Sequence, residues 1–173
     1  MANYKELLKH INTFIFDYDG VLSDGSVITT NEGEAYRVSN VKDGYALQLA
    51  VKKGYRVAVI SGARSDSMMH RLKALSISDI FLGIERKREV YRAYLASNNL
   101  APNQVLYMGD DIPDYEVMLE AGVPTCPADA AEEIRSVAKY ISHFNGGKGC
   151  VRDVIEQVLK VQGKWMNDDG YHW

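Results

Sequence analysis

The sequence predicts an α/β fold in which a parallel β-sheet lies between two layers of helices. Short apolar runs that end in polar or glycine residues recur along the chain, as expected of strands buried on both faces. Helical patterns lie between these runs, and such alternation is typical of parallel sheets joined by crossover helices. The 173 residues, 46% of them hydrophobic, suffice for one compact core, so residues 1–173 are predicted to form a single domain.

Each predicted element follows from its local pattern. The apolar, β-prone runs that predict strands are residues 11–16, 56–60, 79–82 and 104–108. The segments that predict helices are residues 4–9, 45–53, 66–75, 87–97, 114–120 and 151–161. Gly54 and Gly122 come shortly after two of these helices, where glycine commonly ends a helix. Loops that follow parallel strands gather along one edge of the sheet, so a ligand site is expected there.

One segment interrupts the alternation of strands and helices. Residues 26–30 and 34–39 are β-prone and are joined by Asn31-Glu32-Gly33. This pattern predicts a β-hairpin over residues 26–39, inserted after the first strand. At the other end of the chain, the polar tail at residues 163–173 is predicted to be a frayed terminus.

Composition and charge disfavour several classes of partner. The formal net charge is -3 and the pI is about 5.8, with basic residues scattered along the chain, so we expect no nucleic-acid or membrane partner. No apolar run reaches transmembrane length and no signal-peptide core is visible, which predicts a cytoplasmic protein. Cys126 and Cys150 lie far apart without metal-ligand spacing, and both are expected to be small buried residues.

The most informative site is the acidic turn after the first strand. Asp17 and Asp19 stand one residue apart, and Gly20 permits a sharp change of direction. In extended chain, alternate side chains point the same way, so both carboxylates could face one pocket. One interpretation is that the acids merely cap a turn. The other is that one Asp ligates a hard cation such as Mg²⁺ and attacks phosphorus while the second moves the proton.

A second acidic cluster follows the strand at residues 104–108. Asp110, Asp111 and Asp114 should reach the same sheet edge as the acidic turn, and two such clusters together form a cation site. Alone, this cluster would indicate a helix N-terminus with Pro113 in its first turn, a role that is compatible with metal binding.

Two further strand ends supply groups that suit a phosphate. Ser61 and Gly62 end the strand at residues 56–60 with a hydroxyl and backbone N–H groups at a helix start. Lys87 opens a helix after the strand at residues 79–82 and could place an ammonium against a phosphoryl group. Taken singly, Ser61-Gly62 is an ordinary turn, and Lys87 between Arg86 and Arg88 is a solvated basic face.

Taken in order, these four motifs resemble those of the haloacid dehalogenase-like phosphatases. Over nearly its whole length the chain is similar to the small capless sugar-acid phosphatases, especially the 3-deoxy-D-manno-octulosonate 8-phosphate (KDO 8-phosphate) phosphatases of lipopolysaccharide-precursor synthesis. The stretches that carry this closer likeness are residues 19–25, 41–44 and 146–153. The resemblance implies a Rossmann-like three-layer parallel sheet, the haloacid dehalogenase fold, with an inserted β-hairpin and no cap domain.

The resemblance also implies roles for individual residues. Asp17 would be the nucleophile, and Asp19 the general acid and then the general base. Mg²⁺ would be held by the side chains of Asp17 and Asp110 and by the backbone carbonyl of Asp19. Ser61, Gly62 and Lys87 would hold the phosphoryl oxygens, and Lys87 would also act in catalysis by orienting Asp17. Asp111 and Asp114 would support the metal and Lys87 without touching the substrate.

In these relatives, four chains assemble through the inserted hairpins, and a neighbour's C-terminal segment closes each site. The resemblance therefore implies a homotetramer that uses residues 26–39, with Gly147, Lys148 and Gly149 near an adjacent site. From the residues alone, this glycine-rich segment is a loop before the last helix.

One departure from the family pattern concerns the substrate. Many relatives have an Arg directly after the Ser/Thr-Gly pair, where it can meet the sugar acid's carboxylate; here Ala63 stands there and Arg64 follows. Arg64 could substitute for it, or the substrate could be a nine-carbon 2-keto-3-deoxy acid 9-phosphate. Two alternatives of other classes are a non-catalytic regulatory or assembly domain with this fold, and a receiver-like module phosphorylated by a partner.

Overall fold

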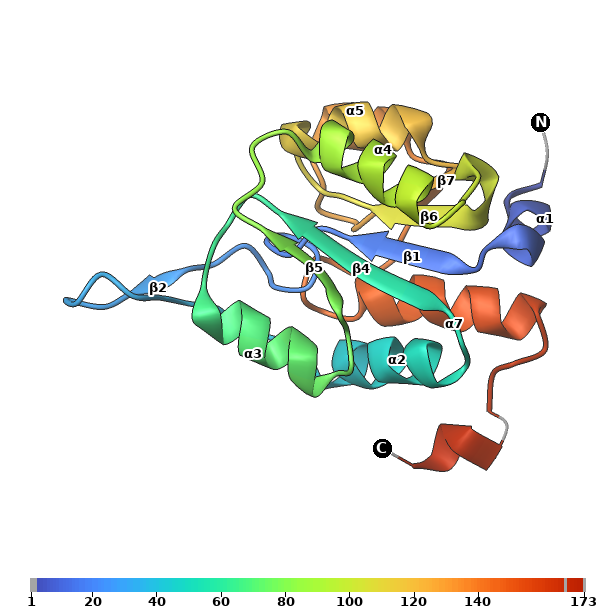
Figure 1. The fold of residues 1–173 in the computed structure, drawn as a ribbon, viewed down its shortest axis with the longest axis horizontal. Coiled ribbons are helices and arrows are strands. Elements are labelled where there is room, and N and C mark those ends of the chain that lie inside the picture. Colours follow the sequence, from blue (N-terminus) through green and yellow to red (C-terminus); the bar gives the residue numbers. More distant parts are fainter. Residues whose placement is uncertain (1–2, 167, 173) are drawn as a thin grey trace.

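The computed structural model describes residues 3–166 and 168–172, so Asn167 and Trp173 of the predicted tail lie outside the described residues. Its centre is a six-stranded parallel sheet in the order β5-β4-β1-β6-β7-β8 (Figure 1). The strands are β1 (Thr13–Phe16), β4 (Arg56–Ser61), β5 (Asp79–Leu82), β6 (Val105–Met108), β7 (Val123–Cys126) and β8 (Tyr140–Ile141). In this order β1 lies between β4 and β6, so the residues that follow these three strands meet at one edge.

Helices cover both faces of the sheet. One layer contains α2 (Val41–Lys52), α3 (Asp66–Ala74) and α7 (Cys150–Val161) (Figure 1). The opposite layer contains α4 (Lys87–Ser97), α5 (Tyr115–Glu120) and α6 (Glu132–Val137). The short helix α1 (Tyr4–Leu7) precedes the sheet, and the 3-10 turns are η1 (Leu8–His10), η2 (Pro102–Gln104), η3 (Ile112–Asp114) and η4 (Asp168–Tyr171). The described residues contain no helix long and apolar enough to cross a membrane.

The period of two in β1 divides the core between the layers. Phe14 and Phe16 pack with α2 and α7, whereas Ile15, between them in sequence, packs with α4 and α5. All three are fully buried, which explains why the run is apolar at every position rather than at alternate ones. The α/β fold with a parallel central sheet is therefore as predicted.

Two strands and one helix were not predicted from the sequence. β7 contains Pro124, a residue that weakens any strand prediction, and β8 has only two residues. α6 has six residues and one fully buried position, Ile134, so its amphipathic signal is short. β7 and β8 extend the sheet beyond β6. Residues of β7 and at the start of α6 also hold the second acidic loop, because the Gly109 N–H donates to the Thr125 carbonyl and the Ala131 N–H donates to the Asp110 carbonyl.

The predicted hairpin is present but is shorter than residues 26–39. β2 (Ile28–Thr29) pairs antiparallel with β3 (Ala35–Tyr36), and Gly33 has a φ of +84° in the turn that joins them. The hairpin projects from the body of the molecule (Figure 1). Within the described part of the chain, β2 and β3 form a sheet of their own, and apolar side chains of the hairpin stay exposed, including Ile28 at 61% and Val38 at 62%.

The C-terminal tail does not match the predicted frayed terminus where it is described. The Tyr45 hydroxyl donates a hydrogen bond to the Gly170 carbonyl, and Nζ of Lys52 lies 3.2 Å from the His172 carbonyl oxygen. The Arg152 guanidinium lies 5.5 Å from the Trp165 ring centre and 5.7 Å from that of Tyr45. These contacts hold the tail against α2 and α7 of its own chain.

Candidate active site

A cavity of about 450 Å³ opens at the carboxyl ends of β1, β4 and β6. The predicted site residues that line it are Asp17, Asp19, Ser61, Gly62, Lys87, Asp110 and Asp111. They come from four separate loops, which parallel strand order brings to one sheet edge. The structure therefore places both acidic clusters, the Ser-Gly turn and the lysine around a single space.

Asp17 is buried and is held from two sides. Its Oδ2 lies 2.7 Å from Nζ of Lys87, and its Oδ1 accepts a hydrogen bond of 2.6 Å from the backbone N–H of Tyr18. Burial, followed by the charge of Asp114, raises the pKa of Asp17 to about 7 against the opposing effect of Lys87. A fixed carboxylate with one ammonium beside it has the placement of a nucleophile for phosphorus.

Lys87 is fixed by Asp114, a fully buried carboxylate. Nζ of Lys87 lies 2.8 Å from Oδ1 of Asp114, which also accepts from the Tyr107 hydroxyl, while Oδ2 accepts from the Asp110 backbone N–H at 3.2 Å. Burial opposes the charge on Lys87, but Asp114 and Asp17 outweigh it and raise its pKa. Asp114 thus holds Lys87 from behind, and both of its oxygens have donors.

Tyr107 was not predicted as a site residue. Its place within the apolar run of β6 indicated core packing, and most of its ring is indeed core. The hydroxyl nevertheless supports Asp114, and burial followed by the charge of Asp114 raises its pKa well above the usual value. A polar tip at the end of a buried aromatic ring gives no periodic signal that a sequence pattern could reveal.

Asp110 carries the feature that points to a cation. Its Oδ1 is buried and has no hydrogen-bond partner among the described residues. One oxygen each from Asp17, Asp110 and Asp114 lie within 4.8 Å of one another. Burial, together with the charges of Asp17 and Asp114, raises the pKa of Asp110 to about 8. A hard divalent cation such as Mg²⁺ would give Oδ1 of Asp110 a partner and would reduce the repulsion between these three carboxylates.

Gly20 leaves the room that Asp110 occupies. A Cβ added at Gly20 would lie 1.9 Å from Oδ2 of Asp110, and its φ of +80° favours glycine in any case. The change of chain direction predicted at Gly20 therefore also brings the two acidic loops close together. Oδ1 of Asp110 has no donor and each oxygen of Asp17 has one, whereas Oδ1 of Asp114 already accepts from two donors. Asp110 and Asp17 therefore keep more acceptor capacity for a cation than Asp114 does.

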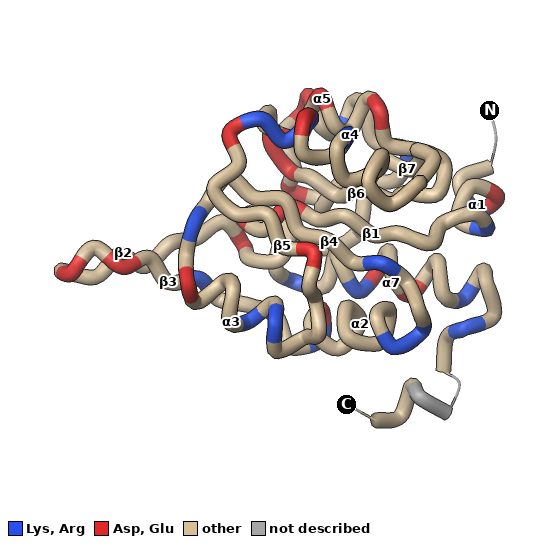
Figure 2. Tube along the Cα trace, in the orientation of Figure 1, with Lys and Arg blue, Asp and Glu red and all other residues tan. Residues whose placement is uncertain are grey.

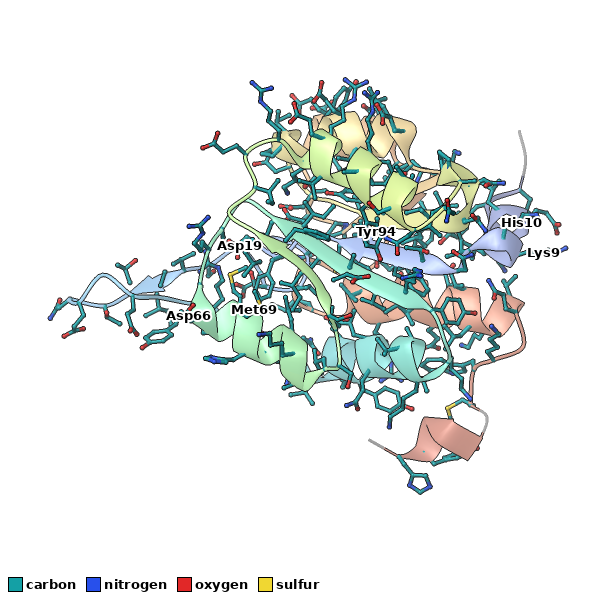
Figure 3. All side chains as sticks on the ribbon, in the orientation of Figure 1. Lys9, His10, Asp19, Asp66, Met69 and Tyr94 are labelled. Atoms are coloured by element: carbon teal, nitrogen blue, oxygen red, sulfur yellow. The ribbon has the colours of Figure 1, made fainter. Side chains whose placement is uncertain are left out.

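The side chain of Asp19 is held by a residue of the hairpin segment. Nε of Arg37 lies 2.6 Å from Oδ1 of Asp19, and Nη2 of Arg37 lies 2.9 Å from Oδ2 of Asp19. The Ser23 hydroxyl also donates to Oδ1, at 3.1 Å. Figure 3 shows Asp19 between the strand ends and the base of the hairpin. Arg37 was missed because nothing in the sequence links a basic residue in the hairpin to this acid.

The phosphate-binding candidates differ in where they lie. Ser61 is buried at the end of β4, where its Oγ accepts a hydrogen bond of 3.2 Å from the Ala63 N–H. Arg64 does not line the cavity; its guanidinium lies against Gly83, where an added Cβ would come within 2.8 Å of Nε. A contact between Arg64 and substrate therefore stays a prediction. Asp111 caps η3 by accepting from the Ile112 N–H at 2.8 Å.

The glycine-rich segment at residues 146–149 packs against the loop that follows Asp19 in the same chain. A Cβ added at Gly146 would lie 1.9 Å from the Gly20 carbonyl oxygen, and the Gly147 N–H donates to the Val21 carbonyl at 2.9 Å. Nζ of Lys148 lies 2.9 Å from Oδ2 of Asp24. These residues are not part of the cavity lining, so a role for Gly147, Lys148 and Gly149 at a neighbour's site stays a prediction.

Comparisons with known proteins agree with this architecture. The family described as haloacid dehalogenase-like hydrolase matches residues 36–128. The 3-deoxy-D-manno-octulosonate 8-phosphate phosphatase of Yersinia pestis is 36% identical over 155 residues, which cover 90% of this chain and 83% of that protein. The corresponding phosphatase of Escherichia coli K12 is 35% identical over 156 residues, which cover 90% of this chain and 83% of that protein.

Solved structures show the same likeness. The phosphatase of this name from Moraxella catarrhalis, solved with a magnesium ion, a phosphate ion and a KDO molecule, superposes with a TM-score of 0.91 at 35% identity and covers 94% of each chain. The cobalt-bound enzyme of Haemophilus influenzae superposes with a TM-score of 0.90 at 29% identity, covering 95% of this chain and 98% of the other. The chain therefore belongs to the haloacid dehalogenase-like hydrolases, in the group that contains the 3-deoxy-D-manno-octulosonate 8-phosphate phosphatases.

Proposed function

We propose that this protein is a Mg²⁺-dependent phosphatase that hydrolyses 3-deoxy-D-manno-octulosonate 8-phosphate to KDO and inorganic phosphate. The observation that carries the proposal is the position of Asp17, buried between the ammonium of Lys87 and the acidic group that contains the unpartnered Oδ1 of Asp110. The relatives' activity and the Mg²⁺, phosphate and KDO of the Moraxella catarrhalis structure support the substrate and cofactor.

The reaction follows from the positions of the carboxylates. An oxygen of Asp17 attacks phosphorus, and the bond between phosphorus and the sugar oxygen breaks while Asp19 gives a proton to the departing alcohol. In the second half, Asp19 takes a proton from water, whose oxygen attacks phosphorus and releases phosphate from Asp17. Lys87 and the Ser61 hydroxyl hold phosphoryl oxygens throughout.

The cofactor Mg²⁺ would supply positive charge beside Asp17 and Asp110. When bound by the side chains of Asp17 and Asp110 and the backbone carbonyl of Asp19, Mg²⁺ neutralises phosphoryl charge and screens the carboxylates from one another. Asp114 and Asp111 support this arrangement from behind, Asp114 by fixing Lys87 and the backbone of Asp110.

A phosphate-release assay tests the function. The purified chain with Mg²⁺ is offered KDO 8-phosphate, a nine-carbon 2-keto-3-deoxy acid 9-phosphate, and hexose phosphates as controls. We expect turnover to be fastest with the eight-carbon ester and to be abolished in Asp17→Asn. Preference for the nine-carbon ester would overturn the substrate assignment, and substantial activity in Asp17→Asn would overturn the mechanism. A non-catalytic domain or a phosphate-accepting signalling module would release no phosphate from any ester.

We also propose that the protein is a homotetramer assembled through the hairpin at residues 26–39. The exposed Val27, Ile28, Tyr36 and Val38 side chains form an apolar surface on this projecting segment, which a second copy of the chain would cover. Residues 147–149 would then lie near a neighbour's site, with the tail in the closing role. Light scattering of the intact chain checks the assembly, and Ile28→Lys with Val38→Lys should shift it to smaller species.

A further inference from the structure

We propose that Arg37 is a positioning residue that aims the carboxylate of Asp19 at the proton it transfers. The inference rests on the proposed function, because Asp19 matters only if a leaving group and a water molecule exchange protons with it. Through Arg37, the hairpin segment would contribute to catalysis within its own chain, separately from any contact between chains.

The contact between the two side chains is two-pronged and sheltered. Nε and one terminal nitrogen of Arg37 reach separate oxygens of Asp19, at 2.6 and 2.9 Å. The Arg37 side chain is only 8% exposed, while that of Asp19, which lines the cavity, is 31% exposed. A planar guanidinium in this geometry fixes both the position and the plane of a carboxylate, which a single ammonium does not.

Counting the acceptor positions shows what the arrangement leaves free. A carboxylate offers about four lone pairs, two on each oxygen. Oδ1 of Asp19 accepts from Arg37 and from the Ser23 hydroxyl, whereas Oδ2 accepts from Arg37 alone. One lone pair, on Oδ2, therefore remains for the transferred proton, and Arg37 determines where it points.

Arg37 is itself anchored by the hairpin backbone. Its third nitrogen donates to the Ala35 carbonyl oxygen at 3.2 Å, which fixes the guanidinium relative to β3. Tyr36 and Val38, its neighbours in sequence, are exposed, while Arg37 is turned toward Asp19, as the period of two of extended chain requires. The orientation of the Asp19 carboxylate therefore depends on the backbone at the base of the hairpin.

No other basic side chain of the site is placed for this task. Lys87 is the only Lys or Arg among the described residues that line the cavity, and it already contacts Asp17 and Asp114. Removing the Arg37 guanidinium should therefore leave the nucleophile, the cation site and phosphate binding in place. The expected signature is a lower kcat with little change in KM.

A double-mutant cycle on KDO 8-phosphate hydrolysis tests the proposal. Four forms are compared: the unaltered chain, Arg37→Gln, Asp19→Asn, and the two changes together. We expect Arg37→Gln to lower kcat by about 100-fold, since misplacing a reacting group by about 1 Å costs that much, and to change KM by less than about threefold. Because Arg37 acts through Asp19, adding Arg37→Gln to Asp19→Asn should cause no further loss.

A matched control separates this effect from general loss of an ion pair. Arg92 also makes a two-pronged contact, with Glu120 on the outer face of α4 and α5, and lies outside the cavity lining. Arg92→Gln should keep the kcat of the unaltered chain. Arg37→Lys keeps the positive charge but cannot contact both oxygens of Asp19 through a planar guanidinium. It should give a kcat between those of Arg37→Gln and the unaltered chain.

The outcomes distinguish the two proposals. If the unaltered chain turns over and the losses from Arg37→Gln and Asp19→Asn multiply, or if Arg37→Gln raises KM alone, Arg37 does not position Asp19. If Arg37→Gln does not fold, the same cycle is run with Arg37→Lys and read in the same way. If the folded, unaltered chain hydrolyses no phosphate ester, the proposed function itself fails.

Discussion

Nζ of Lys87 lies 2.7 Å from Oδ2 of Asp17, which places the only ammonium among the described residues of the cavity lining beside the candidate nucleophile. Lys87 reaches this position because Asp114 holds the same nitrogen at 2.8 Å. The ammonium can therefore orient Asp17 and meet a phosphoryl oxygen from one fixed point. A long flexible side chain with a single partner would not be so constrained.

Lys87→Met should lower kcat by about 100- to 1,000-fold, as found when one group that stabilises the transition state is lost. It should also destabilise the fold, because Asp17 and Asp114 would lose their buried partner. Phosphate release and urea unfolding measure the two effects. Lys160→Met, which removes an exposed partner of Glu156, is the control and should change neither. A near-normal kcat in Lys87→Met would contradict the assigned role.

The stability of the metal-free protein should fall as pH rises from about 4 to about 8. Burial raises the pKa of Asp17 to about 7 and that of Asp110 to about 8 from an ordinary value of 3.8. Their protonated forms therefore favour the folded state below pH 3.8, and this contribution is lost as pH rises through the folded values. Mg²⁺ binds the ionised carboxylates, so the sign reverses when it is present.

Thermal unfolding at pH 5 and pH 8.5, with EDTA or with Mg²⁺, tests this prediction. The Mg²⁺-induced rise in melting temperature should be larger at pH 8.5, and it should disappear in Asp110→Asn. An equal Mg²⁺ effect at both pH values would show that the cation does not compete with protons for these carboxylates.

Gly20→Ala should abolish cation-dependent turnover. The added methyl group would lie 1.9 Å from Oδ2 of Asp110, so the Asp110 side chain must leave its place beside Asp17. Gly33→Ala is the matched control, because Gly33 has a similar φ of +84° but no atom lies within 4 Å of an added Cβ. Mg²⁺ titration followed by phosphate release compares the two variants. Loss of turnover in both would indicate backbone strain as the cause, and not the clash with Asp110.

Asp43→Ala should lower the free energy of unfolding by about 2 kcal/mol, the upper range for loss of a helix cap. Asp43 is buried in α2 and accepts hydrogen bonds from the Gly149 and Arg152 N–H groups, at 3.1 and 2.7 Å. It thereby caps the N-terminus of α7 from another helix. Urea unfolding measures the change. Glu6→Ala, which removes an exposed partner of Lys9, should have almost no effect, and equal losses would contradict the cap.

Much of the site could be predicted from sequence because its acids follow buried strands. The apolar runs that became β1, β4, β5 and β6 fix which loops meet, and strand order brings Asp17, Ser61 and Asp110 to one edge. Contacts that depend on side-chain reach could not be predicted. The hydroxyl of Tyr107 and the guanidinium of Arg37 come from segments whose patterns report only strand and hairpin.

The glycine-rich segment shows the same limit. Its likeness to relatives predicts a role near a neighbouring chain, while the structure also shows a role within the chain, where Gly146 and Gly147 let the backbone approach the loop after Asp19. Two glycines that allow close contact with a distant loop look the same in sequence as a flexible linker.

The contact of Gly147 with Val21 also affects when the enzyme can become active during its synthesis. The acidic turn is made well before its backbone partner at residues 146–147 and the helix α7 that follows them. A nascent chain still held on the ribosome short of residue 146 thus carries its candidate nucleophile in a loop that lacks both this backbone partner and α7. Catalytic competence should therefore arise only after residues 146–161 have been made.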